Sequence, residues 1–225
     1  MSTQTEKAFR HFHEQLEELT QRLLDMSLHV ETAIDLAVDA LLERDPDRAD
    51  TVLVGDRALD ALELEIEQIA VSLLALQQPM ARDLRFVIGA IKISADLERV
   101  GDHAVNIAEC ALRIHREGIR LLPQPEIAAM ARDSRRMLVD AIDSFVRSDA
   151  SLGRDVCRRD DGVDDRHDAN FRVLIEQMRA DPSTIFSALQ LILVSRNLER
   201  IADLATNIAE DAVYLAEGRT IKHGG

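Results

Sequence analysis

The stretch LERVGDHAVNIAE at residues 97–109 returns as LERIADLATNIAE at residues 198–210, identical at nine of thirteen positions. Apolar residues in both copies recur every three or four positions, which places them along one face of an α-helix. Each copy also carries a glutamate and an aspartate four positions apart, Glu98 and Asp102 in the first. The repeat therefore predicts two equivalent helices, each with a pair of carboxylates one turn apart.

The composition predicts a soluble helical protein. The 225 residues are 46% hydrophobic but only 3% aromatic, with no Trp and five Pro. Such a composition favours long helices over sheets, which draw on aromatic and β-branched residues. The formal net charge of −14 argues against a nucleic-acid partner, because phosphate backbones bind to basic surfaces. No apolar run approaches the roughly 20 residues of a membrane span, so we expect a cytoplasmic protein without a transmembrane segment.

Prolines and polar stretches divide the chain into six helices of about 25 to 38 residues, grouped three and three. The predicted breaks are at Pro46, Pro79, residues 118–125, residues 147–151 and Pro182. A repeat period near 100 residues is too long for a solenoid, so duplication of a three-helix bundle is the simplest account. We predict an all-α fold of two tandem pseudo-symmetric three-helix bundles, residues 1–118 and 119–225.

A second acidic pair precedes the repeated stretch in each half, Asp56 and Asp60 in the first. If the second and third helices pack antiparallel about Pro79, Asp60 lies level with Glu98, and Asp56 lies level with Asp102. The same construction holds about the equivalent turn of the second half. Four converging negative charges repel unless they are protonated or neutralised by a cation. The residues predicted to form the two carboxylate clusters are Asp56, Asp60, Glu98, Asp102, Asp160, Asp164, Glu199 and Asp203.

An all-oxygen cluster between facing helices suits magnesium, manganese or iron, and helical bundles build di-metal carboxylate sites in this way. Zinc is a further candidate, although it usually takes His or Cys as well. Arg99 and Arg200 follow the two glutamates and are the rivals to a metal, since they could neutralise the acids themselves. Asn106 and Asn207 lie one turn further along the acidic face, as added ligands or as donors to the ligands.

Two further stretches, QQPMARDLR at residues 77–85 and YLAEG at residues 214–218, accompany the Glu-Arg helices and the Asp-x-x-x-Asp pairs. In this order, over essentially the full length, these motifs resemble the PhoU family of phosphate-transport regulators. The resemblance implies two PhoU-type bundles with multinuclear metal clusters, most often iron and sometimes zinc, bound by the eight carboxylates. The chain departs from the family pattern at Ala202, where Gly is usual, and Gly162 interrupts the fifth helix beside its Asp pair.

The resemblance also implies a function. PhoU proteins are cytoplasmic negative regulators of phosphate uptake by the Pst transporter and of the phosphate-starvation two-component response. The implied partners are the ATPase subunit of the transporter and a membrane sensor histidine kinase, which would bring the protein to the inner face of the membrane. The family further implies a homodimer.

A di-metal carboxylate oxidase or hydrolase is the alternative. The sequence holds no Gly-rich phosphate loop and no nucleophile beside a base motif. Carboxylate-bridged oxidases carry paired Glu-x-x-His motifs, yet no His stands three residues after Glu98 or Glu199. His103 and His167 align near the clusters, and either could join one, but we expect both as lone surface histidines. We therefore predict a metal-binding regulator and no enzyme; a purely structural helical protein, whose acids bind only arginine, is a third alternative.

Overall fold

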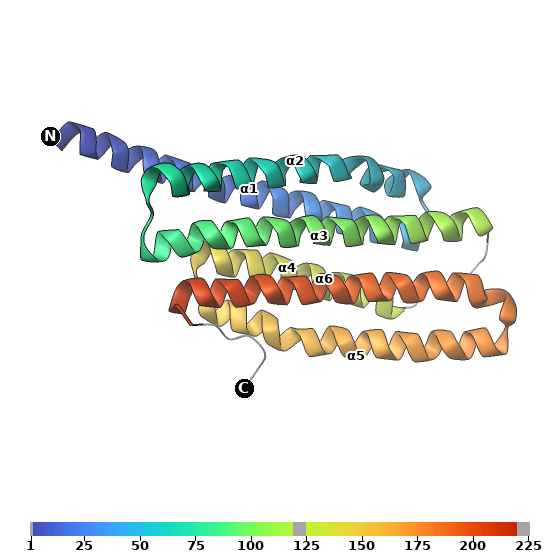
Figure 1. Cartoon of the computed structure of the whole chain (residues 1–225). Helices are drawn as coiled ribbons and strands as arrows, with labels where there is room; N and C mark the ends of the chain where they lie inside the picture. The colour runs from blue at the N-terminus through green and yellow to red at the C-terminus, as the bar shows by residue number, and fades with distance from the viewer. Residues whose placement is uncertain (1, 119–124, 220–225) are drawn as a thin grey trace.

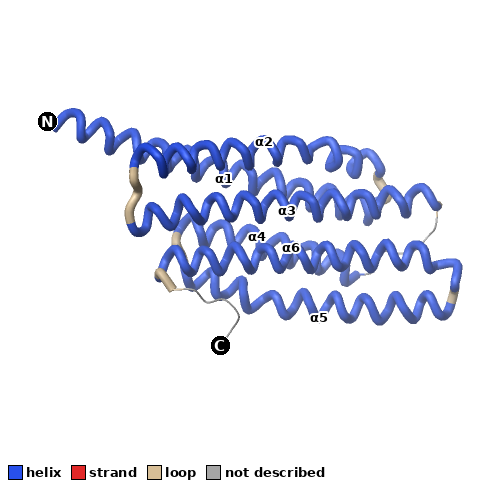
Figure 2. Tube along the Cα trace, in the orientation of Figure 1, coloured by secondary structure: helices blue, strands red, loops and turns tan. Residues whose placement is uncertain are grey.

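The computed structural model describes residues 2–118 and 125–219 as six α-helices and one short 3-10 turn, and these residues form no strand (Figure 1 and Figure 2). The helices are α1 (Ser2–Glu43), α2 (Pro46–Gln77), α3 (Ala81–Glu117), α4 (Pro125–Arg147), α5 (Ala150–Ala180) and α6 (Ile185–Glu217). The 3-10 turn η1 (Pro182–Thr184) joins α5 to α6. The predicted all-α class and the six helices are confirmed.

The helices pack as two three-helix bundles, α1 to α3 and α4 to α6, whose axes are nearly aligned. In Figure 1, α2, α3, α6 and α5 form a front layer, and α1 and α4 lie behind it. The halves meet where α3 packs against α6 and α1 packs against α4. The two helices that carry the repeated stretch are therefore central and antiparallel. The predicted boundary after residue 118 adjoins residues 119–124, which lie outside the described part of the chain.

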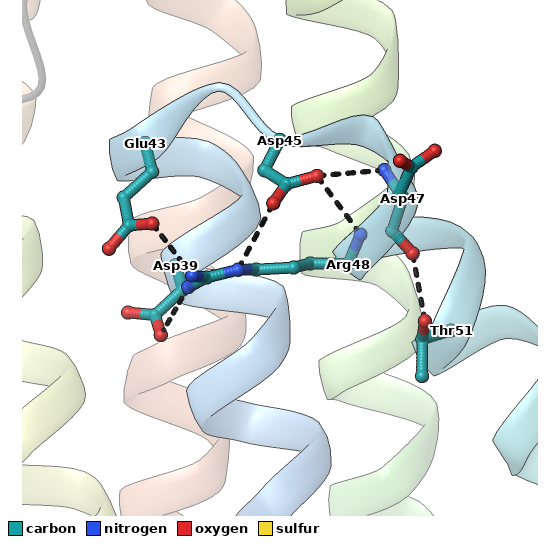
Figure 3. Close-up of polar contacts among 6 residues, drawn as sticks. All are labelled: Asp39, Glu43, Asp45, Asp47, Arg48 and Thr51. Carbon is teal, nitrogen blue, oxygen red and sulfur yellow. Dashed lines mark hydrogen bonds and ion pairs between the residues drawn. The ribbon is translucent and has the colours of Figure 1, made fainter.

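The turn between α1 and α2 shows how local sequence reverses the chain (Figure 3). The Asp45 carboxylate accepts hydrogen bonds from two backbone N–H groups of the first turn of α2, and Pro46 takes the first helical position. The Arg48 guanidinium lies among three carboxylates, 2.8 Å from Asp39, 2.8 Å from Glu43 and 3.2 Å from Asp45. The predicted cap and break at this position are confirmed.

Two helices differ in length from the prediction: α1 has 42 residues and α4 has 23. Neither Pro nor Gly precedes Pro46, so nothing interrupts α1, and Figure 1 shows its first turns projecting beyond α2. In α4, Pro125 occupies the first helical position, and Arg147 is the last residue because Ser148 has a left-handed φ of 53°. Asp149 then caps α5 as Asp45 caps α2.

One continuous apolar core runs through both bundles. Phe145 of α4 is fully buried, and its ring stacks on Phe86 of α3 with 5.0 Å between centroids. Gly89 makes this approach feasible, since a Cβ there would lie 2.6 Å from a Phe145 ring carbon. The duplicated halves therefore share a core.

Candidate functional site

The first predicted cluster lies where α2 and α3 run antiparallel. Burial raises the pKa of the half-buried Asp56, and the charges of Asp60 and Asp102 raise it further. Burial also raises the pKa of Glu98, and the charges of Asp102 and Glu63 add to this effect, followed by those of the two aspartates on α2. Each of the four predicted acids either has its pKa raised by the charge of another or raises the pKa of another. All four predicted residues therefore meet in one electrostatic cluster.

The second cluster lies between α5 and α6. Burial raises the pKa of Asp160 to about 6, and the charges of Asp164 and Asp203 add to the shift, followed by that of Asp161. The pKa of Asp164 is raised for the same reasons, burial first and then the charges of Asp203 and Asp161. The duplication has thus produced a second concentration of negative charge.

Glu199 differs from its counterpart Glu98. It is half-buried on α6, yet it is not among the main causes of the pKa shift of Asp160 or of Asp164. The structure consequently gathers four predicted residues in the first cluster and three in the second, where Asp161 joins them.

The two arginines take different partners. Arg99 forms its ion pair with Asp96, which belongs to neither cluster. Arg200 instead places Nη1 2.7 Å from Oδ2 of Asp203. Both guanidinium groups are largely exposed, so each ion pair stabilises the fold only weakly. Arg200 therefore pairs with one acid of the second cluster, whereas Arg99 pairs with no acid of the first.

The two histidines, His103 and His167, lie in different surroundings. His103 turns to the other half of the molecule, where Nδ1 lies 2.8 Å from Oδ1 of Asn197 on α6. His167 stays beside the second cluster and acts to lower the pKa of Asp164, while its Nδ1 lies 2.9 Å from Oγ of Ser195. Both are partly buried, so the predicted surface positions are only partly correct.

Sequence reasoning missed two acids that the structure places at the clusters, Glu63 and Asp161. Glu63 aligns with His167, so the alignment of the halves already marked this position as a neighbour of the cluster. Asn106 and Asn207, predicted to assist the ligands, are exposed and form no hydrogen bond with a described residue.

The donor chemistry of the second cluster fits a cation. Oδ1 of Asp160 is buried and meets no donor at hydrogen-bond geometry among the described residues, although the nearby Thr206 hydroxyl acts to lower the pKa of Asp160. An unpaired buried carboxylate oxygen is costly unless a cation or a donor meets it. In the described part of the chain, however, no three His, Cys, Asp or Glu side chains are oriented as a ready ligand set. Binding would therefore require these side chains to turn inward.

The surroundings of the two clusters differ. An apolar cavity of about 330 Å³ opens between α1 and α2 beside Asp56, and Leu36 and Gly55 line it. At the equivalent positions of the second half stand Asp140 and Arg159, which form a 2.7 Å ion pair. The groove beside Asp56 in the first half is therefore apolar, whereas charged side chains occupy the equivalent groove of the second half.

Gly101 allows α2 and α3 to approach closely beside the first cluster. A Cβ at this position would lie 2.5 Å from Cδ1 of Leu59, and both residues are buried. The equivalent positions of the second half carry Ala202 and Val163, so a larger residue on one helix is matched by a smaller one on the other. The same helix contact is thus made by Gly101 with Leu59 in one half and by Ala202 with Val163 in the other.

We expect Gly101→Ala and Leu59→Val each to lower the free energy of unfolding by about 1 kcal/mol, the first by overpacking and the second by a lost methylene. The double variant should be near wild type, because the shorter side chain removes the clash and Ala favours the helix. Urea unfolding of the four proteins gives the coupling, expected at about 1–2 kcal/mol. Simple additivity of the two losses would contradict the close contact.

Comparison with known proteins then decides the family. The family model of the PhoU domain matches twice, over residues 23–111 and 127–212, once in each bundle. The chain belongs to the PhoU family. A PhoU homologue of Aquifex aeolicus, named a phosphate-specific transport system accessory protein, is 40% identical over 93% of this chain and 94% of its own length. A homologue of the same name from Pseudomonas putida is 37% identical over 95% of this chain and 84% of its own length.

Solved PhoU structures have the same fold. The crystal structure of PhoU from Pseudomonas aeruginosa superposes with a TM-score of 0.89 and 36% identity, over 92% of this chain and all of that one. The crystal structure of the phosphate transport system regulatory protein PhoU from Streptococcus pneumoniae superposes with a TM-score of 0.86 and 30% identity, over 94% of this chain and all of that one. PhoU is a family of regulatory accessory proteins and not of enzymes, which decides against the oxidase or hydrolase. None of the described helices has the length and apolar character of a membrane span.

Proposed function

We propose that this chain is a cytoplasmic, metal-binding regulator of phosphate homeostasis. It lowers phosphate uptake through the Pst transporter and keeps the phosphate-starvation two-component response off when phosphate is plentiful. The observation that carries the proposal is the pair of pseudo-equivalent carboxylate clusters on a PhoU fold. The names of the relatives, accessory proteins of phosphate transport, support the regulatory role.

The metal proposal rests on the chemistry of the clusters. In the first half Asp56, Asp60, Glu98 and Asp102 would hold the metal. A bound cation would neutralise the mutual repulsion of the acids and tie α2 to α3. Iron is our first choice because of the family resemblance, and zinc, manganese and magnesium are the alternatives.

In the second half, Asp160, Asp164 and Asp203 would bind the metal, and Glu199 would have to turn toward them. Here a bound cation would tie α5 to α6. Arg200 must release Asp203 before that carboxylate can serve as a ligand. The first cluster has no such competitor, since Arg99 pairs with Asp96. We therefore expect the first cluster to bind its metal more tightly.

The proposed partners are the ATPase subunit of the phosphate transporter and a sensor histidine kinase, reached at the inner face of the membrane. We also propose that two copies of this chain form a homodimer. The first bundle offers a surface for such contacts, because six exposed apolar side chains lie along the stretch from α2 to α3. These are Leu64, Val71, Leu76, Met80, Leu84 and Ile88.

Deleting the gene from its native host tests the regulatory role. We expect phosphate-starvation genes to be expressed in phosphate-rich medium, and the wild-type gene to restore repression. A variant with Asp102→Asn and Asp203→Asn should fail to restore it, whereas Asp165→Asn, at an exposed position outside the pKa-shifted clusters, should succeed. Unchanged expression after deletion would refute the regulatory role. Full repression by the double variant, with no transition metal in purified wild-type protein, would refute the metal.

A further inference from the structure

A polar pocket lies in the seam between the two halves, away from the apolar cavity. Its volume is about 390 Å³, and only α3 and α6 line it (Figure 1 shows these helices side by side). The lining residues from α3 are His103, Asn106, Glu109, Cys110 and Arg113, and those from α6 are Leu193, Arg196, Asn197 and Arg200. The pocket thus concentrates three arginines in a chain whose net charge is −14.

The arginines are only partly neutralised. Arg113 donates a 2.7 Å hydrogen bond to Oε2 of Glu109, and Arg200 pairs with Asp203 at 2.7 Å. Arg196 is exposed and forms neither a hydrogen bond nor an ion pair with any described residue. Of the lining residues only Glu109 is acidic, so the pocket carries an excess of positive charge.

The equivalent region at the other end of the seam is neutralised internally. There Lys92 forms a 3.1 Å ion pair with Asp211, and Arg99 pairs with the buried Asp96. Alignment of the repeats shows which residues differ. Ala95, Asp96, Asp211 and Tyr214 at that end correspond to Arg196, Asn197, Cys110 and Arg113 in the pocket. In the pocket, Asn197 and Cys110 stand in place of the two acids, and Arg196 and Arg113 stand in place of Ala95 and Tyr214. Only this end of the seam is therefore basic.

The pocket is also built from fixed groups. Asn197 is held in place by two contacts, with Nδ1 of His103 at 2.8 Å and the carbonyl oxygen of Leu193 at 2.8 Å. Cys110 is buried and closes the inner wall. Guanidinium groups present planar forks of donors that match the oxygen edges of a phosphate, so converging arginines favour this ligand. A carboxylate has two oxygens in one plane and so offers fewer acceptor positions to three converging arginines than a tetrahedral phosphate does.

We propose that this pocket binds a phosphate group, either inorganic phosphate or a small phosphomonoester. The tetrahedral dianion accepts hydrogen bonds from Arg113, Arg196 and Arg200, and the exposed amide of Asn106 adds a donor. Hydrogen phosphate also carries a proton to donate, and the free oxygen of the Glu109 carboxylate accepts it. Sulfate lacks that proton, as does a fully ionised phosphomonoester, so both bind less tightly than hydrogen phosphate. Binding requires no metal in the carboxylate clusters, although a metal at the second cluster would free Arg200 from Asp203.

Isothermal titration calorimetry of the full chain tests the site. The protein is treated with EDTA, so that phosphate bound through a metal cannot contribute, and is titrated with inorganic phosphate, glycerol 3-phosphate and sulfate at constant ionic strength. We expect one saturable site per chain for a phosphate ligand and at least tenfold weaker binding of sulfate. The stronger of the two phosphate ligands identifies the form that is bound.

Variants locate the binding. Arg196→Gln should weaken phosphate binding at least tenfold, and Asn197→Asp, which restores the acid of the opposite end, should abolish it. Arg132→Gln removes an exposed arginine outside the pocket and should change nothing. Absence of binding in EDTA-treated wild type, equal binding of sulfate, or unchanged affinity in both pocket variants would overturn the proposal. None of these results bears on the gene-deletion phenotype or on metal content, so this inference and the proposed function fail separately.

Discussion

Replacing Phe145 by Ala is expected to lower the free energy of unfolding by about 3–5 kcal/mol, the usual cost of removing a fully buried aromatic side chain. Phe145 belongs to α4 but stacks on Phe86 and covers Gly89, both on α3. The cavity would therefore open between the halves. For a chain of this length such a loss corresponds to a decrease in melting temperature of roughly 6–20 °C. Calorimetry measures the change, and wild type should melt in one transition because the core is shared.

Two further variants assign the effect to this contact. Phe171→Ala removes the same side chain where it is 44% exposed and should cost far less. Gly89→Ala should destabilise wild type by about 1–3 kcal/mol, because the new methyl group meets a rigid ring, and should be tolerated once Phe145 is Ala. Separate melting of two halves in wild type, or equal losses for Phe145→Ala and Phe171→Ala, would contradict a shared core.

Asp160→Asn is expected to stabilise the metal-free protein at pH 8. The pKa of Asp160 is raised from 3.8 to about 6, mainly by burial and then by Asp164, Asp203 and Asp161. Between pH 4 and 6 the folded state binds more protons than the unfolded state, so wild-type stability falls as the pH rises through this window. Two pKa units correspond to nearly 3 kcal/mol, and partial exposure reduces this to about 1–2 kcal/mol.

Urea unfolding in EDTA, from pH 3.5 to pH 8, checks this prediction. The gain from Asp160→Asn should appear above pH 4, grow to pH 6 and then level off, whereas Asp165→Asn should show no such gain. Adding iron or manganese should stabilise wild type, by about 2.7 kcal/mol at one hundred times the dissociation constant, and stabilise Asp160→Asn less. A less stable Asp160→Asn protein at pH 8 would mean that the acid is satisfied in the folded state without a metal.

Local features of the sequence determined the helices and the position of the carboxylates. Asp45 and Asp149 cap the helices that follow them by accepting hydrogen bonds from backbone N–H groups of the first turn. The 3.6-residue period sets which side chains share a helix face. Antiparallel packing about a short turn then places Asp56 level with Asp102, whatever the rest of the fold does. For these reasons the six helices, the two bundles and most of both acidic clusters were predictable.

Only the tertiary structure decided the partners of the long polar side chains and the contents of the seam. Lys92 of α3 pairs with Asp211 of α6, and Arg135 of α4 pairs with Glu31 of α1. Such choices depend on a few ångströms between helices that are distant in sequence, and each is worth about 1 kcal/mol or less. Helical periodicity carries no information about them. The shared core at Phe145 and the basic pocket between α3 and α6 likewise arise only when the two halves pack together.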